Sequence, residues 1–199
     1  MKRRPKNVHE EMYPESIPTY MAKVLELAEK SLTPEGKQLM YKLLRAAPDI
    51  WDRLLSGSNK YHKRRDGSIP VVAEHVYWML NAYVKTVAMW NVTLPSEEGD
   101  WRFLAILFHD VMKFGEKGED THTNEMHNWL GGDWMNEMLE DLNVPWRRKI
   151  IEAIDHHMGR WSDTLLGDFP WETTELTPFS RFVHILDMLE TFNCLSTEE

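Results

Sequence analysis

Residues 103–114, FLAILFHDVMKF, decide the fold of this chain and indicate its chemistry. Six consecutive apolar residues lead into His109 and Asp110, and Lys113 follows within one helical turn. An imidazole and a carboxylate carried into a protein interior by such a segment are unfavourable unless they meet a partner or a cation. Because both are common metal ligands, the stretch predicts a buried helix that ends at a metal site.

Apolar residues recur at helical spacing on both sides of this stretch, and we find no strand alternation and no internal repeat. A Thr-Pro-Glu sequence at 33–35 is typical of a helix start, with Thr33 as the N-cap. The predicted helices cover residues 21–28, 34–47, 70–87, 100–113, 122–141, 145–158 and 177–195, with a further short helix over 49–55. The fold class is therefore all-α, a single compact helical bundle.

Composition and charge narrow the class of protein. With 199 residues, of which 42% are hydrophobic, we expect a flexible polar arm over residues 1–16 and one helical domain over 17–199. A net charge of −9 argues against broad affinity for nucleic acids or anionic membranes. The single cysteine, Cys194, excludes an internal disulfide framework and favours a reducing compartment. Because we find neither a signal-peptide pattern nor a membrane-spanning apolar run, we expect a cytoplasmic protein.

Further candidate ligands lie on both sides of the His-Asp pair. His75 shares the apolar stripe of its helix, and taken alone it is better explained as a packed core histidine. His127 is balanced between a core residue and a ligand. Asp187 interrupts the apolar segment FVHILDMLE (182–190), where a carboxylate needs a metal ion or a buried Arg or Lys. His184, one turn earlier, either orients a ligand or is a plain packed side chain.

Two adjacent histidines, His156 and His157, close the segment IIEAIDHH (150–157). The period of its isoleucines places His157 toward the core and His156 to one side, which slightly favours His157 as a ligand. No thiolate accompanies these candidates. The donor set therefore suits Mn, Fe, Co, Ni, Zn or Mg in a reactive site rather than a structural zinc.

This ordered series resembles the HD superfamily of metal-dependent phosphohydrolases. The family motif is a first His, an adjacent His-Asp pair and a distant Asp, which here are His75, His109, Asp110 and Asp187. The Lys that follows the motif is Lys113. The resemblance covers roughly residues 70–192 and implies an HD-type helical bundle around a divalent metal site.

Two more segments resemble the two-metal members of this superfamily. His127 is followed four residues later by Gly131, and IIEAIDHHMGRW (150–161) carries the double histidine. The resemblance implies two divalent ions, with His127 and His156 as the added ligands, and it overrides the periodicity that favours His157. His157 and His184 are then extra ligands or residues that orient one. The double histidine is also similar to that of HD-domain exoribonucleases and of cyclic-dinucleotide phosphodiesterases, although the GYP triplet of the latter is absent.

The resemblance implies hydrolysis of a phosphoester or phosphoanhydride bond by a metal-activated hydroxide. The substrate would be a nucleotide, another phosphorylated small molecule or a nucleic-acid end. Asp110 and Lys113 would be catalytic, and Lys113 and Arg160 would contact the substrate. Two alternatives share the ligand series, namely a di-iron oxygenase of the HD fold and a non-catalytic HD binding module. The identity of the substrate and of the metals, the choice between one ion and two, and the oligomeric state stay open at this point.

Overall fold

The computed structural model of the chain describes residues 19–55, 69–89, 93–142, 145–159 and 176–192. The regular secondary structure of these residues is helical, and their β contact is an isolated antiparallel bridge between Leu54 and Val71. The helices are α2 (Thr19–Ser31), α3 (Pro34–Ala46), α4 (Val72–Met89), α5 (Glu97–Phe108), α6 (His127–Met138), α7 (Arg147–Asp155) and α9 (Pro178–Thr191). Every helix in this part of the chain is too short or too polar to span a lipid bilayer.

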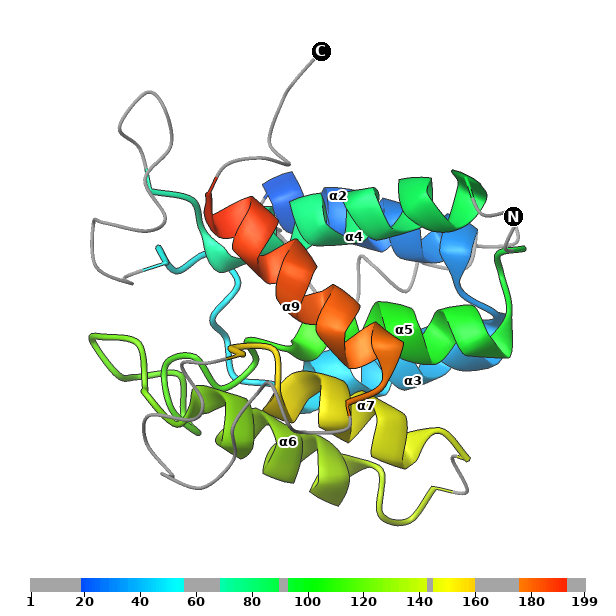
Figure 1. Ribbon diagram of the computed structural model, residues 1–199. Helices are drawn as coiled ribbons and strands as arrows, with labels where there is room; N and C mark the ends of the chain where they lie inside the picture. Colours follow the sequence, from blue (N-terminus) through cyan, green and yellow to red (C-terminus); the bar gives the residue numbers. More distant parts are fainter. Residues whose placement is uncertain (1–18, 56–68, 90–92, 143–144, 160–175, 193–199) are drawn as a thin grey trace, which may run out of the picture.

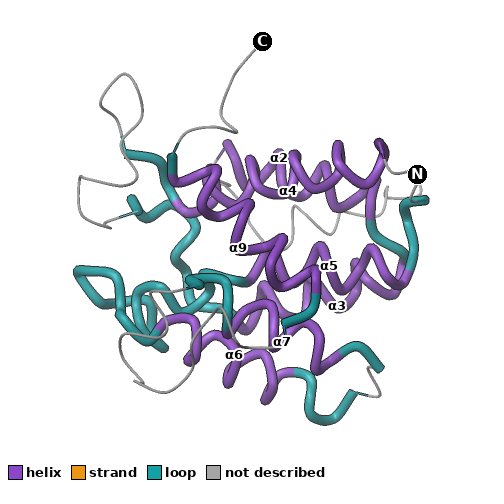
Figure 2. Tube along the Cα trace, viewed as in Figure 1, coloured by secondary structure: helices purple, strands orange, loops and turns teal. Residues whose placement is uncertain are grey.

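The helices are arranged in three tiers, which Figure 1 and Figure 2 show from the same side. α2 packs on α4 in the upper tier, α3 on α5 in the middle tier, and α6 on α7 in the lower tier. α9 runs obliquely across the front of the bundle and contacts both α4 and α7. The middle tier is joined to the others through contacts of α5 with α4 and with α7. The carboxyl end of α5 is therefore surrounded by other helices.

The central position of α5 explains its apolar sequence. All side chains from Phe103 to Phe108 are fully buried, so this helix is apolar around its whole circumference rather than along one stripe. At the amino end of the same helix, Trp101 packs edge-on against Phe179 of α9 with ring centroids 4.8 Å apart. The apolar run thus places the residues that follow Phe108 deep inside the bundle.

Capping interactions tie neighbouring helices to one another. The Thr33 hydroxyl accepts a hydrogen bond from Gly36 N at the start of α3 and donates one to the Asp100 carboxylate of α5. At the start of α9, Thr177 caps the helix while its own backbone N–H donates to Glu152 of α7 at 2.7 Å. These contacts fix α3 on α5 and α9 on α7, so the helix ends that carry the site have defined positions.

The helical class predicted from the sequence is confirmed, but some boundaries differ. Residues 49–55 form turns and the isolated bridge rather than a short helix, because Leu55 N and Val72 N bond across to Pro70 and Arg53. α5 ends at Phe108, and turns held by bonds such as Lys113 N to Asp110 O follow it. α6 begins at His127, five residues later than predicted. The predicted arm over residues 1–16 lies outside the described part of the chain.

Candidate metal centre

Imidazole and carboxylate groups from five different segments meet beside the end of α5. His75 lies on α4, His109 and Asp110 follow α5, His127 opens α6, His157 follows α7, and Asp187 lies on α9. The four imidazoles and Asp110 are each at most 3% exposed. The Asp187 side chain is 16% exposed, so it lies at the edge of the cluster that solvent can reach.

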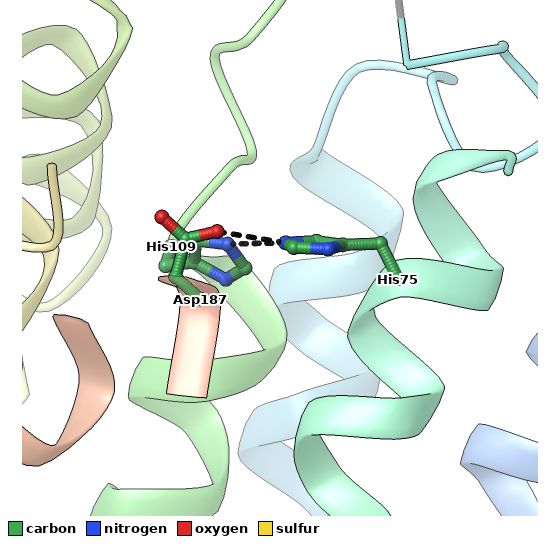
Figure 3. A group of neighbouring side chains, drawn as sticks. All are labelled: His75, His109 and Asp187. Atoms are coloured by element: carbon green, nitrogen blue, oxygen red, sulfur yellow. Dashed lines mark hydrogen bonds and ion pairs between the residues drawn. The ribbon is translucent and has the colours of Figure 1, made fainter. Parts of the chain in front are cut away.

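The first part of the cluster consists of His75, His109 and Asp187, which Figure 3 shows converging from separate segments. His75 Nε2 lies 3.2 Å from His109 Nε2 and 3.2 Å from Asp187 Oδ1. One donor atom from each residue therefore faces a common point. We call these three residues group A.

The second part consists of Asp110, His127 and His157, which we call group B. His127 Nε2 lies 3.2 Å from His157 Nε2 and 3.1 Å from Asp110 Oδ1, and the His157 Nε2–Asp110 Oδ1 distance is 3.4 Å. The other carboxylate oxygen, Asp110 Oδ2, lies 3.5 Å from His109 Nε2 and 3.9 Å from His75 Nε2. Asp110 thus presents one oxygen to each group.

Hydrogen bonds on the far side of each imidazole fix which nitrogen faces the cluster. His109, His127 and His157 each approach the backbone carbonyl three residues earlier through Nδ1, at 2.8, 2.7 and 2.7 Å. His75 Nδ1 instead lies against the Glu190 carboxylate. Because a carbonyl or carboxylate oxygen can only accept, each Nδ1 carries a proton. A neutral ring then points the lone pair of its Nε2 into the cluster.

A comparison with family models agrees with this geometry. The model described as HD domain matches residues 72–191, a span that runs from α4 into α9 and contains every residue of groups A and B. The chain belongs to the HD domain family. Most of this family are metal-dependent phosphohydrolases. No curated protein and no solved structure matched the chain.

The donor atoms of this HD domain fit divalent metal ions. Asp110 Oδ1 is buried and makes no hydrogen bond within the described residues, although two imidazole nitrogens lie within 3.4 Å of it. When both imidazoles are neutral, these contacts bring acceptor atoms together, which is unfavourable in a buried site without a cation. A donor set of imidazoles and carboxylates without a thiolate is typical of reactive sites for transition metals.

Burial and charge keep most of the donors in the form that binds metals. Burial lowers the pKa of His127 and lowers that of His109 to about 3, so both rings are neutral at pH 7. Burial alone would raise the pKa of Asp110, but the Lys113 ammonium and the neighbouring His109 outweigh it and hold this pKa well below its usual range. The pKa of Asp187 is likewise lowered, through its contact with His75, against the effect of burial. The HD domain therefore carries two carboxylates that stay ionised, Asp110 in the interior and Asp187 at the edge of the cluster.

His75 is the exception among the ligands. Burial would lower its pKa, but Glu190 on one side of the ring and Asp187 on the other raise the pKa to about 10. Without a metal ion, His75 thus carries the positive charge that these two carboxylates require. A divalent ion held by Asp187 and His75 Nε2 would supply that charge in place of the proton.

Of the two adjacent histidines, His157 is the one that lies in the cluster. α7 ends at Asp155, and a turn follows that ends at Gly159, whose φ is +60°. His157 lies within this turn and points into group B. His156 instead packs edge-on against Trp129 with ring centroids 5.6 Å apart and belongs to neither group. The geometry therefore favours the periodicity of the isoleucines over the assignment of His156 that the family resemblance implied.

The remaining predicted site residues lie around these two groups. Lys113 is 5% exposed, and its Nζ lies 2.5 Å from Asp110 Oδ2. His184 Nδ1 lies 2.7 Å from the backbone carbonyl of His157, and its ring packs against Gly159, so it supports the turn that carries His157. Arg160 lies outside the described residues.

Glu190 is a site residue that the sequence reasoning missed. It lies one helical turn after Asp187 on α9, it is 1% exposed, and its carboxylate contacts His75 Nδ1. The spacing of the two acidic residues, i and i+3 on an apolar helix, places them on one face and could have indicated it.

Proposed function

We propose that this HD domain is a metal-dependent phosphohydrolase that cleaves a phosphoester or phosphoanhydride bond of a nucleotide or a nucleic-acid end. The observation that carries the proposal is the arrangement of Asp110, whose two oxygens face two groups of donors while a buried ammonium, Lys113, lies beside it. An anion-binding cation next to paired metal ligands is the combination that phosphoryl chemistry needs.

We assign two divalent ions to the site. Group A, His75, His109 and Asp187, would hold one ion, and group B, Asp110, His127 and His157, would hold the other. Asp110 would contribute to both sites because its oxygens point to opposite sides of the cluster. His157 replaces His156 in this ligand set. Divalent ions held by these residues would act as Lewis acids and would supply a nucleophile at neutral pH by lowering the pKa of water.

The chain's own residues orient and neutralise the reacting groups. The Nδ1–H hydrogen bonds hold the imidazoles in one orientation, so their Nε2 atoms need no rearrangement when a substrate arrives. Lys113 pairs with Asp110 and would stabilise the charge that develops on the non-bridging phosphoryl oxygens. The high burial of the ligands excludes bulk water, which strengthens these interactions.

The choice of substrate class follows from the charge of the site and of the chain. Lys113 suits a compact phosphate oxygen, and Arg160 is proposed as a second contact. A net charge of −9 opposes non-specific binding along a nucleic acid, so we propose that the enzyme acts on a free nucleotide or on a terminal phosphate.

A substrate screen tests this function. Purified protein is assayed on nucleoside mono- and triphosphates, cyclic nucleotides and end-labelled oligonucleotides, each with Mn²⁺, Co²⁺, Ni²⁺, Mg²⁺ and Fe²⁺. We expect metal-dependent phosphate release that Asp110→Ala abolishes, because this change removes the carboxylate shared by both groups, while the far-UV circular dichroism of the variant stays helical. Full activity in Asp110→Ala would remove this site from the reaction.

A further inference from the structure

Glu190 and Asp187 contact the two nitrogens of a single imidazole from opposite sides. Asp187 Oδ1 lies 3.2 Å from His75 Nε2, and the Glu190 carboxylate contacts His75 Nδ1. Both acidic residues lie on α9, one turn apart, whereas His75 lies on α4. His75 and Glu190 are 0% and 1% exposed, so solvent does not weaken their contact.

The other three imidazoles of the cluster use a different partner. His109, His127 and His157 lie at helix ends or in turns, and each contacts a neutral backbone carbonyl three residues earlier. His75 lies in the first turn of α4, and its Nδ1 contacts a side chain of another helix rather than a backbone carbonyl. That side chain is a carboxylate, Glu190 of α9.

A carboxylate partner affects the tautomer, the donor strength and the orientation of an imidazole more than a backbone carbonyl does. A carboxylate that accepts Nδ1–H fixes the tautomer in which Nε2 is the donor atom, and it makes that nitrogen a stronger ligand. Since a charge-assisted hydrogen bond is roughly twice as strong as a neutral one, Glu190 also resists rotation of the ring. His75 is thereby prepared as a ligand of the group A ion.

We propose that Glu190 is a positioning residue that sets the metal affinity of group A through His75. The inference rests on the proposed metal site, but it concerns the strength of one ligand and is read from metal binding rather than from turnover. A purely structural role, in which Glu190 only joins α9 to α4, would leave the affinity for the ion unchanged.

The test is calorimetric titration of chelator-treated protein with Mn²⁺. Glu190→Gln keeps the shape and the acceptor oxygen but loses the charge, and Glu190→Ala loses both. We expect the dissociation constant of the group A ion to rise by about 10-fold for Glu190→Gln and about 100-fold for Glu190→Ala. His75→Ala identifies which binding step belongs to group A. The visible spectrum of the Co²⁺ form should change with Glu190→Ala, because it reports the ligand field of the imidazole.

Glu152→Gln is the matched control. Glu152 of α7 is also a carboxylate that contacts α9. It accepts hydrogen bonds from Thr177 N and from the Ser180 hydroxyl, and neither donor is an imidazole. Its substitution should lower thermal stability and leave the Mn²⁺ affinity as in the parent protein. If Glu190→Gln binds Mn²⁺ as tightly as the parent, the positioning role of Glu190 is wrong while the metal site stands. If the parent itself binds no divalent ion, the proposed function fails, and the role of Glu190 fails with it.

Discussion

The turn after α7 decides which of two adjacent imidazoles joins the candidate metal ligands of groups A and B. His157 is 1% exposed and lies 3.2 Å from His127 through their Nε2 atoms. His156 is half-buried beside Trp129. The two residues have the same chemistry, so any difference between their variants must come from position.

This position gives a prediction for paired substitutions. His157→Ala should remove a ligand of group B, so the protein should bind one divalent ion fewer per chain and lose phosphohydrolase activity by about 100-fold or more. His156→Ala should keep the metal content of the parent protein. Metal analysis by mass spectrometry after dialysis, together with initial rates, checks both. Equal loss of metal in the two variants would argue against the assignment of His157.

At the scale of the elements, α6 and α7 approach one another closely at a glycine of α6, Gly132. A Cβ on Gly132 would overlap the Asp155 carboxylate, whereas a Cβ on the adjacent Gly131 would lie 3.1 Å from Ile154 Cγ2, a tight contact without overlap. These two helices carry His127 and lead into His157, so their spacing sets the geometry of group B.

We therefore expect Gly132→Ala to be the more damaging of two otherwise matched changes. It should lower the free energy of unfolding by about 1–3 kcal/mol, because the added methyl overlaps the Asp155 carboxylate and forces that side chain or the helices to shift. Gly131→Ala, whose nearest contact needs a shift of only a few tenths of an ångström, should cost less. Urea unfolding of both variants measures the difference. The account of helix spacing is contradicted if Gly132→Ala is as stable as the parent.

The Asp155 carboxylate of α7 makes the stability of the fold depend on pH. Burial, reinforced by the nearby Asp133, raises the pKa of Asp155 to about 7, above the value of about 3.9 expected in the unfolded chain. A group whose folded pKa is raised contributes stability that is complete below the unfolded pKa. That contribution is lost as the pH rises through the folded pKa, here between about pH 4 and pH 7.

Asp155→Asn should remove this loss. The free energy of unfolding of the variant minus that of the parent should be about 2 kcal/mol larger at pH 8 than at pH 5. The partial exposure of the carboxylate reduces this amount below what the full pKa shift would give. Asp133→Asn is a control that should keep most of the parent's pH dependence, since burial is the larger cause. Unfolding of chelator-treated protein at the two pH values tests this. An unchanged pH dependence in Asp155→Asn would contradict the buried carboxylate.

At the scale of the whole molecule, the sequence predicts the helical class and most of the candidate ligands for a physical reason. His75, His109 and Asp187 are each a polar residue within or at the end of an apolar helical segment, so each contrasts with its neighbours in the sequence. Such a contrast is local, so it can be read without knowing how the helices pack. The segments that carry the ligands are therefore predictable one at a time.

Features that depend on chain reversal or on contacts between helices are not predictable in this way. His157 lies beyond the last helical residue of α7, so the period of the isoleucines favours it only slightly, and the turn that follows the helix sets its final direction. Glu190 is a polar residue near the end of α9, and only the packing of that helix on α4 turns it toward His75. Residues 49–55 lack a helix because they pair with the segment before α4, a contact distant in sequence.

The central claim is that the interior of this bundle is a binding site for two divalent ions, and a metal titration of the intact chain tests it most directly. Chelator-treated protein is titrated with Mn²⁺ while bound metal and melting temperature are followed. We predict two ions per chain and stabilisation that grows with free metal, reaching about 2.7 kcal/mol at a concentration 100 times the dissociation constant. A protein that binds no Mn²⁺, Fe²⁺, Co²⁺, Ni²⁺, Zn²⁺ or Mg²⁺ and whose melting temperature does not change with any of them would contradict the claim.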